Sequence, residues 1–168
     1  RSAMRAQMPT PAQVRQLPEL VRVVVPREWE DLNGHVNVQH HLTMYNLTTV
    51  PLLEQLGISE DWVRTERCGL FDLEHHIWYL NEVHVGDEVS LHLRMTARNA
   101  KRVQGAVYLL NVTRDALASV IEFVSAAADL EARRTMPLPP VIAGRIDETI
   151  AACARLDWAA PASGAISI

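Results

Sequence analysis

A polar turn that leads directly into an apolar-faced helix, within residues 29–57, constrains the fold of this chain more than any other feature. Asp31, Asn33 and His35 surround Gly34 in the turn. Asp, Asn and Gly are common in turns because they tolerate left-handed backbone and hydrogen-bond their own neighbours. The sequence therefore places a carboxylate and an imidazole immediately before the start of a helix.

The helix is predicted to begin near Val38, with Asn37 as its N-cap. Apolar residues follow at the spacing of a half-buried helix, namely Leu42, Tyr45, Leu52, Leu53 and Leu56. Gly57 is a typical stop, and Pro51 predicts a kink or break near Thr49. Free N–H groups at a helix N-terminus favour negative charge. The turn is therefore a candidate site for an oxyanion that develops during a reaction.

Composition limits the class of protein. With 168 residues, 48% hydrophobic and 21% charged, the chain suits one domain with a core. The net charge of −4 gives no reason to expect nucleic acid. No apolar run is long enough for a membrane span, and no secretory signal is visible. Cys68 and Cys153 are interpreted as free thiols in a reducing compartment, so we expect a cytoplasmic protein.

The rest of the chain predicts five strands and two further helices. The strands span residues 19–29, 68–82, 89–98, 103–113 and 117–130. Pro26 ends the first strand or places it at a sheet edge, and residues 85–88 form a hairpin-type connection. Ser59 caps a short helix, and residues 145–156 form a terminal amphipathic helix.

Alternation divides the second strand into two faces. One face carries Leu73, His75, Ile77 and Tyr79, and the other carries Asp72, Glu74, His76 and Trp78. The whole order of elements predicts an α+β fold, with one long central helix wrapped by a five-stranded antiparallel sheet. The outer strands of such a sheet need partners, so we expect a homodimer or homotetramer. We divide the chain into a loose lead (1–18), a main domain (19–140), and a C-terminal helix and tail (141–168).

The run from Asp31 to Asn37 resembles the D-x-x-G-H-x-N signature of hotdog-fold acyl-CoA thioesterases of the 4-hydroxybenzoyl-CoA thioesterase type. Residues 74–79 and the Gly86-Asp87 pair are similar to the second strand and following turn of that family. The resemblance covers residues 21–139 and is greatest for thioesterases of carnitine and betaine breakdown. It implies hydrolysis of a small acyl-CoA, with coenzyme A as part of the substrate and no further cofactor.

The resemblance also implies roles at the turn. Asp31 would act as nucleophile or as general base on water, and the backbone N–H of Val38, with Gln39 as a second candidate donor, would stabilise the oxyanion. His35 would orient the loop or Asp31, and Asn37 would cap the helix. Neither cysteine has a nucleophile motif around it, and no serine elbow occurs.

Predicted substrate contacts are Asn33, Gly34 and His41 near the turn, Glu74, His76 and Trp78 on the second strand, and Arg98, Lys101 and Arg102 at a hairpin end. The basic residues suit CoA phosphates. Trp29, Trp62, Trp78 and Tyr79 are expected in the core, but for a trimethylammonium acyl group two of these four would flank the cation beside Glu74. Many relatives have Asn and Tyr where this chain has Val38 and His41, which bears on acyl specificity. The adjacent histidines at 40–41 and 75–76 point in different directions, so no metal site is predicted.

Four other interpretations stay open from the residues. Asp31 and Asn33 could have no role beyond shaping a turn and capping a helix, and Glu74 could be a solvated surface residue. A hotdog hydratase or dehydratase would use a histidine and a carboxylate to move protons on a β-hydroxyacyl thioester. A module that binds acyl-CoA without turning it over would be unaffected by Asp31→Asn.

Overall fold

An antiparallel sheet of six strands forms the centre of the protein, in the order β1-β3-β4-β5-β2 with β6 paired to β5. The computed structural model describes residues 6–168. The strands are β1 Glu19–Val24, β2 Cys68–Tyr79, β3 Glu88–Arg98, β4 Arg102–Asn111, β5 Ala116–Asp129 and β6 Arg134–Thr135. The five long strands confirm the predicted ones, and the two-residue β6 was not predicted.

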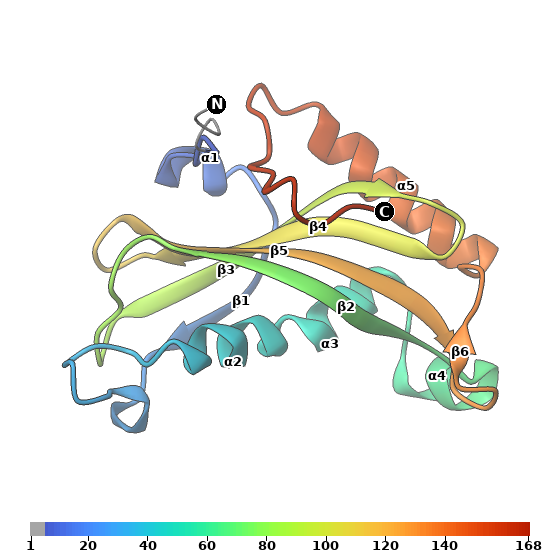
Figure 1. Cartoon of the computed structure of the whole chain (residues 1–168), viewed down its shortest axis with the longest axis horizontal. Coiled ribbons are helices and arrows are strands. Elements are labelled where there is room, and N and C mark those ends of the chain that lie inside the picture. Colours follow the sequence, from blue (N-terminus) through green and yellow to red (C-terminus); the bar gives the residue numbers. More distant parts are fainter. Residues whose placement is uncertain (1–5) are drawn as a thin grey trace.

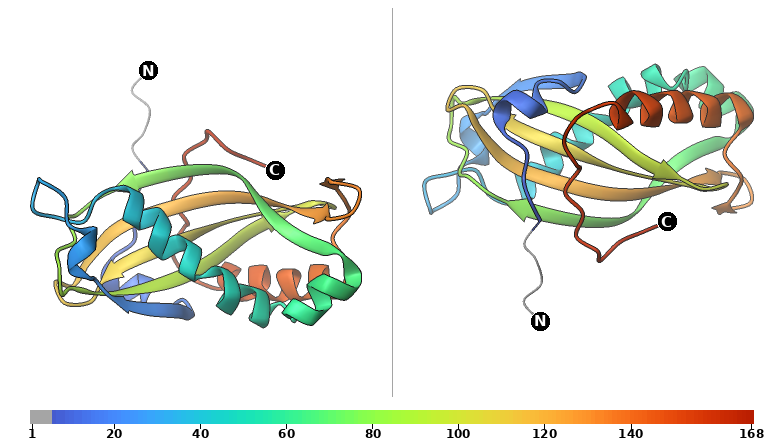
Figure 2. Two further views of the ribbon diagram at one scale, coloured as in Figure 1. Left: turned by 90° about the horizontal axis from the view of Figure 1, so that it is seen from below. Right: turned by 90° about the horizontal axis from the view of Figure 1, so that it is seen from above.

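The helices lie on both sides of this sheet. They are α1 Pro11–Val14, the 3-10 turn η1 Arg27–Trp29, α2 Gln39–Leu47, α3 Thr49–Gln55, α4 Glu60–Glu66 and α5 Pro140–Ala154. Figure 1 shows α2 and α3 on one face, with α1, α5 and the C-terminal segment on the other. In Figure 2 the long strands curve around α2 and α3. The predicted hotdog architecture is therefore confirmed.

The core has two parts, one on each face of the sheet. On the helix side, Met44 of α2 and Leu56 pack against strand residues such as Leu93 and Phe123. On the outer side, residues from α1, the strands and the C-terminal segment form a second cluster. It includes Val14, Leu17, Tyr108, Val120 and Trp158. Most residues of β3, β4 and β5 are buried because both faces of these strands are covered.

The central helix is interrupted, as Pro51 predicts, and is not one long rod. Thr48 separates α2 from α3, and its hydroxyl donates to the carbonyl of Tyr45 at 2.6 Å. Proline has no N–H to continue the helical hydrogen bonds into α2. Leu42, predicted on the buried stripe, is 38% exposed, while Met44 is fully buried.

The connection between β2 and β3 is not a hairpin, which corrects the prediction for residues 85–88. β2 pairs with β5 at one edge of the sheet, and β3 pairs with β1 and β4. The connection therefore crosses the end of the sheet. Its turn packs against the end of β1, because Gly86 N–H donates to the Val25 carbonyl at 2.9 Å and Val25 N–H donates to the Asp87 carbonyl at 2.9 Å.

The two terminal segments are more ordered than the sequence predicts. Thr10 and Gln13 form a reciprocal capping box that begins α1, and Val14 and Leu17 are buried. Residues 1–5 of the predicted loose lead lie outside the described residues. At the other end α5 begins at Pro140, earlier than predicted, and Trp158 of the previously unassigned tail is buried.

Candidate active site

The loop before α2 is held closed by its own backbone. Asp31 N–H donates to the His35 carbonyl and Gly34 N–H donates to the Asp31 carbonyl, both at 3.0 Å. Gly34 has a φ of +77°, a conformation that glycine adopts without steric penalty. An isolated bridge between Glu30 and Val36 closes the base of the loop. The loop thus presents the Asp31 side chain at a fixed place.

The Asp31 carboxylate accepts hydrogen bonds from two asparagines. Asn33 N–H donates to Oδ1 at 2.8 Å, and the Asn37 side-chain amide donates to Oδ2 at 3.1 Å. The Asn33 backbone hydrogen bond lowers the pKa of Asp31 against an opposing effect of burial, and Asn37 lowers it further. Asp31 is therefore ionised at neutral pH. Asn33, predicted as a substrate contact, positions this carboxylate through its backbone N–H.

The start of α2 leaves one backbone donor free beside the loop. Asn37 Oδ1 accepts from Gln39 N–H at 3.1 Å, so Asn37 does cap the helix. Val38 already has helical backbone angles of −53° and −33°. Within residues 6–168 the Val38 N–H has no hydrogen-bond acceptor. Because Gln39 N–H is engaged, Val38 is the predicted oxyanion donor that remains available.

A groove of about 210 Å³ lies next to this donor. It is lined by His35, Val36, Val38, His41, Tyr79, Leu80, Asn81, Glu82 and Val83. The His35 ring does not contact Asp31. Its Nδ1 lies 3.1 Å from the Val36 carbonyl and donates to it, which orients the ring. Tyr79 was considered only as a residue flanking a cation, and Glu82 was not predicted as a site residue, because the end of a strand gives no local signal of what it faces.

His41 forms the buried base of the groove and is held neutral. Its Nδ1 lies 2.7 Å from Ser119 Oγ, and its ring meets Tyr79 edge-on with centroids 5.0 Å apart. Burial, with smaller contributions from the nearby His35 and His40, lowers the pKa of His41 to about 4. A neutral ring in this place supplies a hydrogen bond and shape but no positive charge near pH 7.

The predicted contacts on β2 face away from the groove. Glu74 is exposed on the outer side of the sheet. His76 and Trp78 lie beside one another, with ring centroids 4.5 Å apart, and Trp78 packs on the outer core cluster. Tyr79 points to the opposite, helix side. Among the four aromatic residues considered for a cation site, Trp78 and Tyr79 thus lie on opposite faces of β2 and do not form such a site together.

A β-bulge between Asp72 and Glu74 changes the other predicted face. Strict alternation puts Asp72 opposite to His75, but the extra residue places both on the helix side. Asp72 Oδ2 accepts from the Tyr45 hydroxyl at 2.9 Å and from His75 Nε2 at 3.0 Å, and Ser125 donates to Oδ1 at 2.5 Å. Burial raises the pKa of Asp72, but these hydrogen bonds outweigh it and lower the pKa.

The basic cluster lies at the other end of the sheet within one chain (Figure 1). Arg98 forms a two-point ion pair with Asp147 of α5, at 2.6 and 2.7 Å. Lys101 and Arg102 are exposed in the β3–β4 hairpin. The eleven-residue β3 separates this hairpin from the Asp31 loop, a length of about 35 Å. A single chain therefore does not bring the basic residues to Asp31.

The described residues show neither a metal-binding cluster nor a membrane-spanning helix. Between residues 6 and 168, no cluster of three or more His, Cys, Asp or Glu side chains could hold a metal ion. In the same range no helix is long and apolar enough to cross a membrane.

The model of the thioesterase-like superfamily matches residues 25–146, a span that holds the Asp31 loop, α2 and the whole sheet except β1. The chain belongs to the thioesterase-like superfamily. Among curated members of known name, the betainyl-CoA thioesterase of Pseudomonas aeruginosa is 30% identical over 84 residues, which is 49% of this chain and 53% of that protein. The L-carnitine dehydrogenase/betainyl-CoA thioesterase of Agrobacterium fabrum is 28% identical over 119 residues, covering 71% of this chain and 24% of that protein. The match thus spans about a quarter of the length of the Agrobacterium fabrum relative and about half of the length of the Pseudomonas aeruginosa relative.

Solved structures confirm the fold of this superfamily member. The Staphylococcus aureus protein SAV2348, solved in complex with CoA, superposes with a TM-score of 0.78 at 21% identity, covering 100% of this chain and 98% of that one. The 1,4-dihydroxy-2-naphthoyl-CoA thioesterase Slr0204 of Synechocystis has a TM-score of 0.67 at 19% identity, covering 76% and 94%. At these identities the likeness establishes the fold alone.

Proposed function

We propose that this protein hydrolyses small acyl-CoA thioesters at the Asp31 loop. One observation carries the proposal. An ionised carboxylate accepts hydrogen bonds from Asn33 and Asn37, and the next residue after Asn37 is Val38, whose N–H is free at the start of α2. A nucleophile or base next to an oxyanion donor is what acyl transfer requires. The two relatives named as betainyl-CoA thioesterases support the same chemistry.

In the proposed reaction the thioester carbonyl oxygen accepts from Val38 N–H. In the water-mediated form, Asp31 takes a proton from a water molecule whose oxygen bonds to the carbonyl carbon. The tetrahedral intermediate then collapses, the carbon–sulfur bond breaks, and the proton on Asp31 passes to the leaving CoA thiolate. In the direct form, an Asp31 oxygen bonds to the carbonyl carbon, the carbon–sulfur bond breaks, and CoA leaves as the thiolate. Water then hydrolyses the mixed anhydride, which restores the Asp31 carboxylate and releases the acid, and the proton freed in this step protonates the thiolate.

We further infer that the active unit is a dimer joined through β2. β2 is a twelve-residue strand at the sheet edge. It carries the exposed apolar side chains Phe71, Leu73 and Tyr79. A long apolar edge of this kind needs a partner strand. A cytoplasmic location belongs to the same proposal and is supported by Cys68 and Cys153, which are unpaired thiols.

Thiol release from an acyl-CoA panel tests the proposed activity, with short, aromatic and betainyl thioesters run in parallel. Asp31→Asn should lower kcat at least ~100-fold, because the neutral amide is neither nucleophile nor base. Asp61→Asn makes the same chemical change on exposed α4 and should leave turnover unchanged. No hydrolysis by wild type, or full activity of Asp31→Asn, would refute the proposal. Hydration of an enoyl-CoA would then favour the hydratase, and CoA binding without turnover the binding module.

A further inference from the structure

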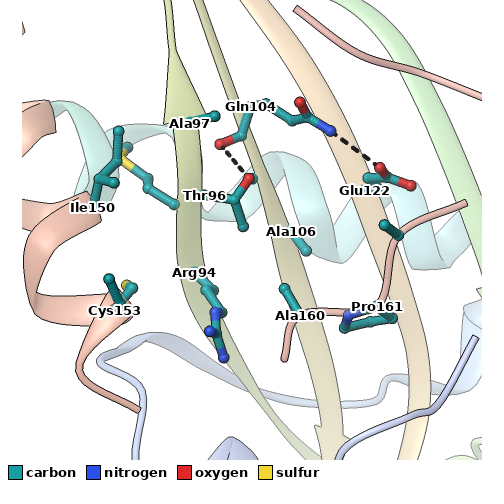
Figure 3. A pocket seen from close by; sticks show the side chains of 14 residues that line it. Arg94, Thr96, Ala97, Gln104, Ala106, Glu122, Ile150, Cys153, Ala160 and Pro161 are labelled. Carbon is teal, nitrogen blue, oxygen red and sulfur yellow. Dashed lines mark hydrogen bonds between the residues drawn. The ribbon is translucent and has the colours of Figure 1, made fainter. Parts of the chain in front are cut away.

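A second cavity lies on the outer face of the sheet, away from α2, α3 and the Asp31 loop. It has a volume of about 420 Å³ and is walled by β3, β4, β5, α5 and the C-terminal segment 160–162. Figure 3 shows the side chains that line it. Two of them carry opposite charges and are almost fully buried, since Arg94 is 7% exposed and Glu122 is 3% exposed.

Arg94 has no counterion in the described part of the chain. Its guanidinium stacks on the Trp158 ring, 4.4 Å from the centroid. No carboxylate lies within ion-pair distance of it among residues 6–168, and its buried Nη1 has no hydrogen-bond partner there. A buried guanidinium in this condition is unfavourable, because no carboxylate or hydrogen-bond acceptor of the described residues compensates for its lost hydration.

Glu122 is a buried negative charge that likewise has no charged partner. Its Oε1 accepts from the Gln104 side-chain amide at 3.2 Å, and its Oε2 accepts from Ser163 N–H at 3.1 Å. Both donors are uncharged, and no cationic group among the described residues pairs with this carboxylate. Figure 3 places Arg94 and Glu122 at different ends of the cavity. They flank Ala106 of β4 in one row of the sheet, but they do not form an ion pair with one another.

We propose that this cavity binds a small zwitterion of the amino-acid or betaine type. The ligand's carboxylate would pair with Arg94, and its cationic group would lie at Glu122. A simple anion would pair with Arg94 but would be repelled by the Glu122 carboxylate. A simple cation would pair with Glu122 but would be repelled by Arg94. The cavity volume is within the range of small-molecule sites. The site lies on the opposite face of the sheet from Asp31, so the proposal does not depend on the proposed function.

Calorimetric titration and thermal unfolding with glycine betaine and glycine test the ligand class. At least one of the two zwitterions should bind and raise the melting temperature. Two half-ligands are the controls. 3,3-Dimethylbutanoate replaces the betaine nitrogen with carbon and keeps the carboxylate, and tetramethylammonium keeps only the cation. Both should bind at least ~10-fold more weakly than betaine, or than glycine if only glycine binds. Absence of binding by both zwitterions, or equal binding of either half-ligand, would overturn the proposal.

Two variants locate the binding. Arg94→Met keeps the length of the side chain and Glu122→Gln keeps its shape, and each should weaken zwitterion binding at least ~10-fold. Arg94→Met should also raise the melting temperature of the ligand-free protein, because it removes a buried charge without a counterion. Asp31→Asn should bind the zwitterion like wild type. Binding that survives both cavity substitutions, or that is lost in Asp31→Asn, would assign the ligand to another site and refute the inference.

Discussion

At the scale of single residues, Asn37 connects the structure of the helix start to the chemistry of Asp31. Its Oδ1 caps α2 through Gln39 N–H, and its Nδ2 donates to Asp31. The N-cap role could be predicted from the sequence, because Asn precedes an apolar periodic stretch. The bond to Asp31 could not, since it depends on how the loop between the two residues closes.

Substitutions of Asn37 should separate these two roles. Asn37→Ala removes both and should lower the free energy of unfolding by about 1 kcal/mol. Asn37→Ser keeps a capping oxygen and should restore most of that stability. Both variants lose the donor to Asp31, which helps lower the pKa of that carboxyl. The acidic limb of kcat/KM against pH should therefore move to higher pH in both. An unmoved limb in either variant would contradict the role given to Nδ2.

The buried ring of His41 predicts a dependence of stability on pH. Burial lowers the pKa of His41 from 6.5 to about 4. Between these two pH values the unfolded chain therefore binds a proton that the folded protein does not. The free energy of unfolding should fall as pH drops through the window, by about 2 kcal/mol between pH 7 and pH 5 from this residue. Urea titrations of wild type and His41→Gln at both pH values measure it. Burial also lowers the pKa of His92, so the variant should retain part of the dependence. An equal loss of stability in both proteins would exclude His41 as a cause.

At the scale of elements, the sequence predicts a feature correctly where the residues of that one segment determine it. The Ser59 cap of α4 and the Pro51 interruption are both present. The β2 bulge could not be predicted because no glycine marks it. The sequence also gives no sign that one residue of the alternating run is unpaired in the sheet. The same error assigned Asp72 to the wrong face. Strand order was missed because β2 meets β5 only through non-local pairing.

Deleting Leu73 tests what the bulge contributes to β2. Asp72 and Glu74 pair with the consecutive residues Ser125 and Val124 of β5, so removing the extra residue between them leaves a regular ladder with Asp72 still on the helix side. The hydrogen bonds of Asp72 to Tyr45 and Ser125 should therefore persist, and the free energy of unfolding, measured by urea denaturation, should change by less than ~1 kcal/mol. Leu73→Ala, which keeps the residue count and trims a side chain that is 45% exposed, is the matched control. A loss of ~2 kcal/mol or more in the deletion alone would show that the bend of the bulge itself is needed to position Asp72.

At the scale of the whole molecule, the separation of the basic hairpin from Asp31 follows from strand register. Arg102 lies opposite Ala126 of β5, and Cys68 of β2 lies opposite Asp129, so the hairpin is at the Cys68 end of β2. Tyr79, at the other end of β2, lines the Asp31 groove. Antiparallel pairing of two β2 edges about a two-fold axis would place the Cys68 end of one subunit beside the Tyr79 end of the other. The proposed dimer would thus bring the hairpin of one chain toward the Asp31 loop of its partner.

Subunit complementation tests this arrangement directly. One protein carries Asp31→Asn, and the other carries Lys101→Glu with Arg102→Glu, which should raise KM for the CoA substrate because like charge meets the phosphates. If a site takes Asp31 from one chain and the hairpin from its partner, mixed dimers have one intact site. Activity should then recover to roughly a quarter of wild type after random subunit exchange, since half of the dimers are mixed. If each chain builds its own site, both sites of a mixed dimer carry a defect, and exchange restores nothing. Light scattering on each protein confirms the dimer first, and a monomer with full thioesterase activity would refute the shared site while leaving the chemistry of Asp31 intact.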